Sequence, residues 1–250
     1  MSSGAHAAPA AKERFAEVVA RLASAQKPRA RGAPAYSVYV NRPVGRRLAA
    51  AAYLAGLTPN AVTAISAVCT FAAIAVIAAA PPAPLTGIAI GLLLVLGYAL
   101  DSADGQLARL RGGGSPSGEW LDHVVDAAKT SSLHLAVLIS WYRFVDLPGD
   151  WLLLIPIGFS IVAAVYFFAM ILNDFLRARH GITPRAGSTG GGIRSLLALP
   201  TDYGVLCLAF LCSGVPAVFV PVYGLLFLAT AAYTLLALAK WFREMTRVGT

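Results

Sequence analysis

The sequence predicts an all-α integral membrane protein, with six transmembrane helices preceded by an N-terminal amphipathic and interfacial helix. Hydrophobic residues make up 58% of the 250 residues and charged residues only 13%, whereas soluble domains carry about 25% charged residues. Apolar segments recur along the chain, several of them near the roughly 20 residues that a spanning helix needs. They are residues 62–80, 85–100, 124–141, 151–172, 196–212 and 217–239.

The chain divides into a flexible basic segment, residues 1–35, and a six-helix membrane domain, residues 36–245. Apolar residues at helical period predict a short amphipathic helix over residues 12–25, either on the anionic inner leaflet or in solvent. Residues 36–57 read as an interfacial helix with Pro43 near its first turn. Thr58 as N-cap and Pro59 as the first helical residue are expected to start the first span.

The basic residues predict which way the helices cross the membrane. They precede the first span, follow the last, and lie in the connections between spans two and three and between spans four and five, while the other side offers only Arg143. This asymmetry predicts a cytoplasmic (inner) membrane protein with both termini cytoplasmic. The formal charge of +8 then belongs to the inner-leaflet side, and no basic patch interleaved with aromatic residues supports nucleic-acid binding.

Three cysteines and the N-terminal segment add little to the functional interpretation. Cys69, Cys207 and Cys212 lie in apolar segments, without the spacing of a disulfide framework or metal site. They are expected to be small buried hydrophobic residues. Residues 1–35 lack the apolar core of a secretory signal, so no cleavage is expected.

Carboxylates at helical spacing are the most informative feature of the chain. Asp101 and Asp104 share one helix face, and Asp122 and Asp126 share another. Four carboxylates around one small volume repel each other unless protons or cations neutralise them. Carboxylate oxygens favour hard ions such as Mg²⁺, Mn²⁺ or Ca²⁺ over zinc, so the pattern predicts a divalent-metal site at the membrane surface.

The connection between the two carboxylate segments supports their convergence. Residues 112–117 form a short glycine-rich turn, which predicts that the flanking helices are antiparallel neighbours. Ser117 is expected to cap the second of these helices. The two carboxylate faces can therefore meet at the cytoplasmic end of the bundle.

The complete spacing is that of a known motif, D-x2-D-G-x2-A-R-x8-G-x3-D-x3-D. It is matched at Asp101, Asp104, Gly105, Ala108, Arg109, Gly118, Asp122 and Asp126. On these residues the chain resembles the CDP-alcohol phosphotransferase (CDP-alcohol phosphatidyltransferase) family over residues 36–245. Thr58, Pro59, Asn60 and Thr63 look like a weaker family feature. The resemblance implies a six-helix membrane enzyme of phospholipid biosynthesis, often a homodimer, that transfers a substituted phosphate from a CDP-alcohol donor to a hydroxyl acceptor and releases CMP.

The resemblance also implies a role for each motif residue. Asp101, Asp104, Asp122 and Asp126 would hold one or two Mg²⁺ or Mn²⁺ ions. The small residues Gly105, Ala108 and Gly118 would leave space for the cytidine nucleotide against the helix surfaces. Arg109 would contact its phosphates. Asp126 is the family-like candidate for the general base. Such ions would neutralise the donor pyrophosphate, which could not otherwise approach the carboxylates.

Glu119 and His123 allow a second interpretation of the donor and of the general base. They are four residues apart, and Gly118-Glu119-x-x-Asp122-His123 looks like the motif of the choline/ethanolamine phosphotransferase branch. A histidine supported by Glu119 can act as a base near neutral pH. The preferred donor is CDP-diacylglycerol, with a small polar alcohol, or its phosphate, as the acceptor. The alternative is transfer of a CDP-choline- or CDP-ethanolamine-type head group to a lipid alcohol.

Other charged residues have two interpretations each. Lys129 either reaches a phosphate or forms a structural charge pair. Four residues at the end of the fourth span, together with Arg194 and Asp202, either shape the acceptor pocket or anchor the protein at the inner leaflet; they are Asn173, Asp174, Arg177 and Arg179. The cytoplasmic loop of residues 173–195, which is glycine-rich at residues 187–192, is either a lid or a linker. Arginines spread through this loop disfavour a phosphorylated acceptor.

A divalent-cation transporter is a distant alternative to the enzyme. Carboxylates inside membrane helices also suit cation pathways. Here they cluster at the cytoplasmic rim, and the outer halves of the helices offer no matching polar path. His134 is expected to be a buried histidine without a catalytic role.

Overall fold

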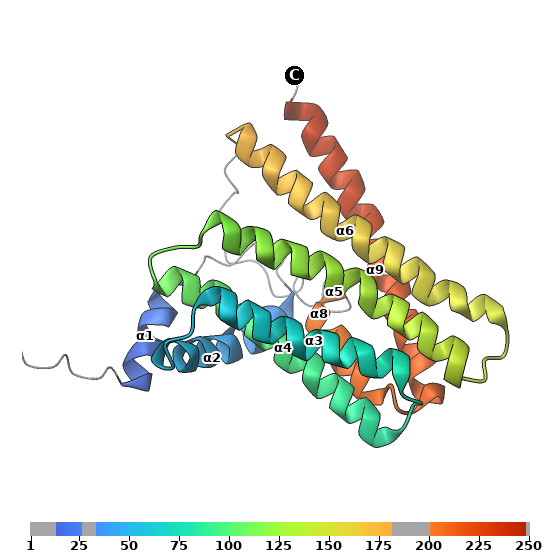
Figure 1. Cartoon of the computed structure of the whole chain (residues 1–250). Helices are drawn as coiled ribbons and strands as arrows, with labels where there is room; N and C mark the ends of the chain where they lie inside the picture. The colour runs from blue at the N-terminus through green and yellow to red at the C-terminus, as the bar shows by residue number, and fades with distance from the viewer. Residues whose placement is uncertain (1–13, 27–33, 182–200, 249–250) are drawn as a thin grey trace, which may run out of the picture.

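A computed structural model describes residues 14–26, 34–181 and 201–248. Within these ranges the chain is helical and contains no strand (Figure 1). The helices are α1 (Phe15–Ser24), η1 (Ser37–Asn41, a π-helix), α2 (Arg42–Leu54), α3 (Pro59–Ala79), α4 (Pro84–Leu110), α5 (Pro116–Phe144), η2 (Asp150–Leu153, 3-10), α6 (Leu154–Arg179), α8 (Tyr203–Ala209), η4 (Phe210–Cys212, 3-10) and α9 (Pro216–Val248).

Four of the described helices are long and apolar enough to cross a membrane: α3, α4, α6 with η2, and α9. The second predicted span continues past its apolar run as one helix through Leu110. The 29-residue α5 is long but carries several charged residues. Residues 196–200 of the predicted fifth span lie outside the described residues, and the described part is a short apolar helix, Tyr203–Cys212. The all-α membrane architecture is confirmed, and the count of six spans remains a prediction.

The helix starts follow the local sequence. Thr58 caps α3, because its Oγ1 accepts a hydrogen bond of 3.1 Å from the Ala61 N–H. Pro43 lies in the first turn of α2. The expectation that Ser117 caps α5 is wrong: Ser115 Oγ accepts from the Gly118 N–H at 3.1 Å. Pro116 explains the difference, because its fixed φ and missing N–H suit the first helical position and leave the residue before it extended.

Helix α1 packs on protein, which neither sequence-based alternative anticipated. Val18 and Leu22 are buried in a small core with alanines of α2 and Leu107 of α4. Following α1, the Gln26 side-chain amide donates to Gln106 Oε1 at 2.6 Å. The apolar face of α1 therefore covers the α2–α4 contact, beside the motif segment of α4.

Helix α3 packs against both α4 and α5, which make few close approaches to each other. The expectation that α4 and α5 are packed antiparallel neighbours is therefore wrong along most of their length. Helix α3 bridges the two, since it packs against each of them. A main core forms around Leu94, Leu133, Val137 and Tyr223. Helices α6 and α9 pack against each other, and only a few of their apolar side chains are fully buried.

Candidate active site

Three of the four motif carboxylates converge. Asp101 comes from α4, and Asp122 and Asp126 lie one turn apart on α5. One carboxylate oxygen of each residue lies within 4.8 Å of the others. All three side chains are partly buried, so water compensates their mutual repulsion incompletely.

Lys129 supplies a positive charge to this cluster. Its Nζ lies 2.6 Å from Asp101 Oδ1 and 2.6 Å from Asp126 Oδ1, and only 9% of its side chain is exposed. Three ionised carboxylates and one ammonium group sum to a charge of −2. Oxygen donors with this residual charge fit a divalent cation of the Mg²⁺ or Mn²⁺ type.

Asp104 faces another way. Its carboxylate accepts a hydrogen bond of 2.5 Å from Thr63 Oγ1 of α3, and the residue is 6% exposed. The Thr63 hydroxyl also lies 3.2 Å from the Pro59 carbonyl oxygen. The side chain thus fastens α4 to the start of α3, and the structure does not bring it into the group of three. Its role as a metal ligand stays a prediction.

The small motif residues border polar side chains. A Cβ on Gly105 would lie 3.4 Å from Arg109 Nη1, and a Cβ on Gly118 would lie 3.0 Å from Asn60 Oδ1. The Nε atom of Arg109 is buried and has no hydrogen-bond partner within the described ranges. A buried guanidinium nitrogen without a partner is costly, and an anion such as a phosphate would satisfy it.

His123 and Glu119 do not form the predicted pair. His123 Nδ1 lies 3.8 Å from Asp122 Oδ2, and 44% of the histidine side chain is exposed. Glu119 is exposed one turn earlier, and neither a hydrogen bond nor an ion pair joins these two described residues. Among the residues that the structure describes, His123 is associated with Asp122, and its part in proton transfer stays a prediction.

The residues expected near the acceptor separate into different environments. Arg177 forms ion pairs with Glu244 of α9 and, at 3.8 Å, with Asp174. Asn173 is buried, and Arg194 lies outside the described residues. Asp202 caps α8, since its carboxylate accepts from the Ser37 N–H at 2.9 Å and the Gly204 N–H at 3.0 Å.

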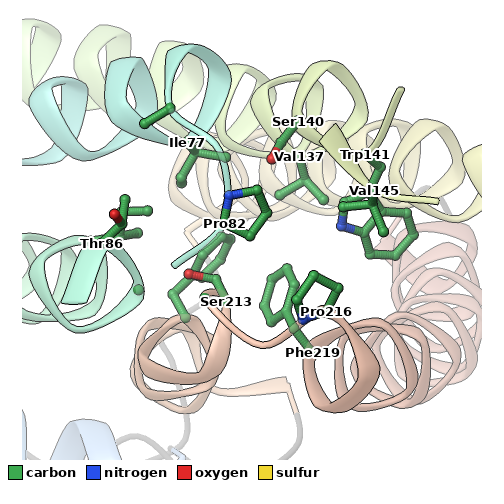
Figure 2. A pocket seen from close by; sticks show the side chains of 15 residues that line it. Ile77, Pro82, Thr86, Val137, Ser140, Trp141, Val145, Ser213, Pro216 and Phe219 are labelled. Carbon is green, nitrogen blue, oxygen red and sulfur yellow. The ribbon is translucent and has the colours of Figure 1, made fainter. Parts of the chain in front are cut away.

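A cavity of about 260 Å³ extends from Asp101 and Asp126 into the bundle, between α4, α5, α6, α8 and α9. Sequence reasoning missed its aromatic walls; they include Tyr98, Phe159, Tyr166, Phe167 and Tyr203. Their only signal in the sequence is aromatic residues within otherwise aliphatic segments. A second cavity, of about 20 Å³, lies at the other ends of the helices, and no carboxylate lines it (Figure 2).

Comparison with known proteins identifies the family. The model of the CDP-alcohol phosphatidyltransferase family matches residues 56–242. Two solved structures of phosphatidylinositol phosphate synthase from Mycobacterium tuberculosis, one with CDP-DAG and one with manganese and citrate, are each similar at 22% identity and a TM-score of 0.46. Each similarity covers 81% of this chain, and 94% and 89% of the respective solved chains. A search of curated proteins gives no match. Because the family model spans most of the sequence, the chain belongs to the CDP-alcohol phosphatidyltransferase family and is a divalent-metal-dependent phosphatidyltransferase of phospholipid biosynthesis.

Proposed function

We propose that the protein transfers the phosphatidyl group of CDP-diacylglycerol to a hydroxyl acceptor and releases CMP. The convergence of Asp101, Asp122 and Asp126 within 4.8 Å carries this proposal. A donor with a pyrophosphate group is strongly anionic, and catalysis of its cleavage depends on positioning and charge neutralisation. The three carboxylates supply the oxygen ligands that such neutralisation needs.

Asp101, Asp122 and Asp126 fit a Mg²⁺ or Mn²⁺ ion, and Asp104 is the fourth proposed ligand. When bound, the ion neutralises the donor phosphates and polarises the phosphorus. Lys129 keeps Asp101 and Asp126 close to each other through its two ion pairs.

The remaining motif residues position the substrates. Arg109 binds a donor phosphate through its unpartnered Nε. Gly105, Ala108 and Gly118 let the nucleotide approach the helix surfaces. The acceptor oxygen attacks the phosphorus that carries the alcohol, the bond from this phosphorus to the bridging oxygen breaks, and CMP leaves. Asp126 accepts the proton of the acceptor hydroxyl, for which general-base help contributes about 10²–10⁴-fold.

The distribution of basic residues along the chain supports an orientation of the protein in the membrane. We place the carboxylates and both termini on the cytoplasmic side of the inner membrane, because the basic connections gather there. The exposed apolar faces of α6 and α9 suit lipid or a second copy of the chain. A homodimer remains a proposal carried over from the family.

A second candidate function is transfer of a choline- or ethanolamine-type head group from its CDP derivative to a lipid alcohol. The observation in its favour is His123, which lies 3.8 Å from Asp122 and is reachable from water. In this reaction His123, with or without Glu119, would take the acceptor proton in place of Asp126.

Release of CMP by the purified protein in detergent tests the proposal. CDP-diacylglycerol, CDP-choline and CDP-ethanolamine are offered separately with an acceptor panel, with Mn²⁺, Mg²⁺ or EDTA. We expect metal-dependent CMP from CDP-diacylglycerol, lost in Asp126→Asn and retained in the matched variant Asp146→Asn, whose carboxylate is exposed between α5 and η2. CMP from CDP-choline alone would establish the second candidate. No CMP and no stabilisation by any CDP-alcohol would contradict both.

A further inference from the structure

The 260 Å³ cavity has two chemically different ends. At one end lie Asp101 and Asp126, the proposed reaction centre. At the other end Leu133 of α5 faces Phe159 and Ala163 of α6, so the walls become apolar. A molecule that fills this space must combine a polar reacting group with an apolar body.

The depth of the cavity excludes a small polyol as its complete occupant. Both Asp126 and His134 line it, and they are eight residues apart on α5, which corresponds to about 12 Å along the helix. The volume of about 260 Å³ lies just below the roughly 300–1,000 Å³ of typical small-molecule pockets. It therefore suits part of a lipid-like molecule, whose remaining chain stays in the bilayer.

The charges along the cavity disfavour a phosphate. Asp101, Asp126 and Asp202 line it, and Lys129 is the one lysine or arginine among its described lining residues. The Lys129 ammonium is already shared between two carboxylates at 2.6 Å each. Phosphate groups are usually bound by arginine forks or several cations. A phosphorylated acceptor would instead meet the carboxylates of Asp101 and Asp126, since that of Asp202 already accepts the N–H groups of Ser37 and Gly204.

At the end of the cavity away from Asp101 and Asp126, His134 provides hydrogen bonding without an ion pair. His134 Nδ1 lies 2.6 Å from the Tyr223 hydroxyl, and the histidine ring stacks on Phe159 with centroids 4.0 Å apart. No ion pair involves His134 within the described ranges. A hydroxyl or ester carbonyl group can be accommodated there, whereas a charged group would lack a partner of opposite sign.

We infer that this cavity binds the acceptor, and that the acceptor is an alcohol without a phosphate group whose apolar body lies between α5 and α6 while its hydroxyl reaches Asp126. This inference rests on the proposed function and names the class of its second substrate. It applies to either donor, because both reactions need a hydroxyl beside Asp126.

A set of matched acceptors tests the chemical class. Monoacylglycerol, diacylglycerol and a fatty alcohol in mixed micelles are compared with glycerol, inositol, glycerol phosphate and inositol phosphate, with CMP release as the readout. We expect the acylated acceptors to give at least tenfold higher kcat/KM than any phosphorylated one. A faster reaction with a phosphorylated acceptor or with a free polyol would overturn the inference and leave the proposed function standing.

A cavity-filling variant tests the location. Ala163→Phe places a ring in the cavity, and Ala164→Phe makes the same change on the exposed face of α6 that carries Ile161 and Phe168. We expect Ala163→Phe to raise the KM for the acceptor at least tenfold, with the KM for the CDP-alcohol within twofold of the wild type. Ala164→Phe should change neither value.

An acyl chain of the donor is the alternative occupant of this cavity. If Ala163→Phe raises the KM for CDP-diacylglycerol and spares the acceptor, the cavity holds a donor chain and the inference is wrong. Loss of folding is separated from loss of binding by melting temperature and by Mn²⁺-induced stabilisation of each variant. Absence of metal-dependent CMP release in the wild type with every donor and acceptor would reject the proposed function itself.

Discussion

The two ends of the helix bundle contain cavities of very different character. At the carboxylate end the cavity measures about 260 Å³ and is lined by three carboxylates and one ammonium group. At the distal end it measures about 20 Å³, close to the volume of a single water molecule. Its lining is mostly apolar, with Trp141, Phe219 and the hydroxyls of Ser140 and Ser213 (Figure 2).

Close packing explains why the distal end is closed. A Cβ on Gly87 of α4 would lie 2.5 Å from the Gly214 nitrogen, and a Cβ on Gly214 would lie 2.8 Å from Pro84 Cα. Glycine here allows the start of α4 to approach the turn before α9. One bundle thus combines a closely packed end with an end that keeps charge and open volume, where we propose that the reaction takes place.

The largest expected effect on the rate of CMP release comes from a substitution at the carboxylate end of the bundle. Asp126→Asn removes a proposed metal ligand and the proposed proton acceptor, so CMP release should fall by about 10³-fold. The melting temperature should change little, because the remaining carboxylates then share the Lys129 charge. Initial rates and thermal unfolding in detergent measure both quantities. A variant that keeps more than a tenth of the wild-type rate would remove Asp126 from the reaction.

Lys129→Met should destabilise the metal-free protein by about 3 kcal/mol, because it leaves buried carboxylates without their cation. Mn²⁺ should restore most of this loss, since the ion supplies the missing positive charge. Thermal unfolding with EDTA and with Mn²⁺ measures the difference. The matched change Lys240→Met, at a side chain that is 68% exposed, should have almost no effect. Equal destabilisation with and without Mn²⁺ would contradict the proposed metal position.

Gly214→Ala tests the packed end. The added methyl group would collide with the backbone of Ala83 and Pro84, and overpacking of this kind costs about 1–3 kcal/mol. The rate of CMP release per folded molecule should stay at the wild-type value. A specific loss of activity without destabilisation would mean that the distal end takes part in the reaction.

Ser213→Ala should have the smallest effect. The Ser213 hydroxyl is buried without a hydrogen-bond partner in the described part of the chain. Removing it should change the free energy of unfolding by less than about 0.5 kcal/mol, or stabilise slightly, because no hydrogen bond to protein is lost. A loss above about 1 kcal/mol would indicate a water that bridges Ser213 to Ser140.

The sequence predicted the features of the fold that depend on interactions between residues close together in the chain. Thr58 and Pro59 start α3 because side-chain capping and proline geometry act within one turn. Asp101, Asp122 and Asp126 converge because helical periodicity places them on two faces that a short turn brings together. The motif spacing was therefore enough to find the carboxylate cluster.

Tertiary packing determined the features that the sequence did not reveal. Val18 and Leu22 give α1 an apolar face, but periodicity cannot say whether lipid, water or α2 covers it. Asp104 shares a helix face with Asp101, yet its hydrogen bond to Thr63 depends on how α3 packs. The aromatic cavity walls come from the three helices α4, α6 and α8, so only the assembled bundle brings them together.

We propose that the carboxylate end carries out the reaction while the distal end only stabilises the bundle. CMP release per folded molecule, measured side by side for the wild type, Asp126→Asn and Gly214→Ala with Mn²⁺ and the CDP-alcohol that the donor panel selects, tests this division of roles. We expect near-complete loss in Asp126→Asn and a wild-type rate in Gly214→Ala. Retained CMP release in Asp126→Asn, or its loss in folded Gly214→Ala, would show that the two ends do not divide the roles in this way.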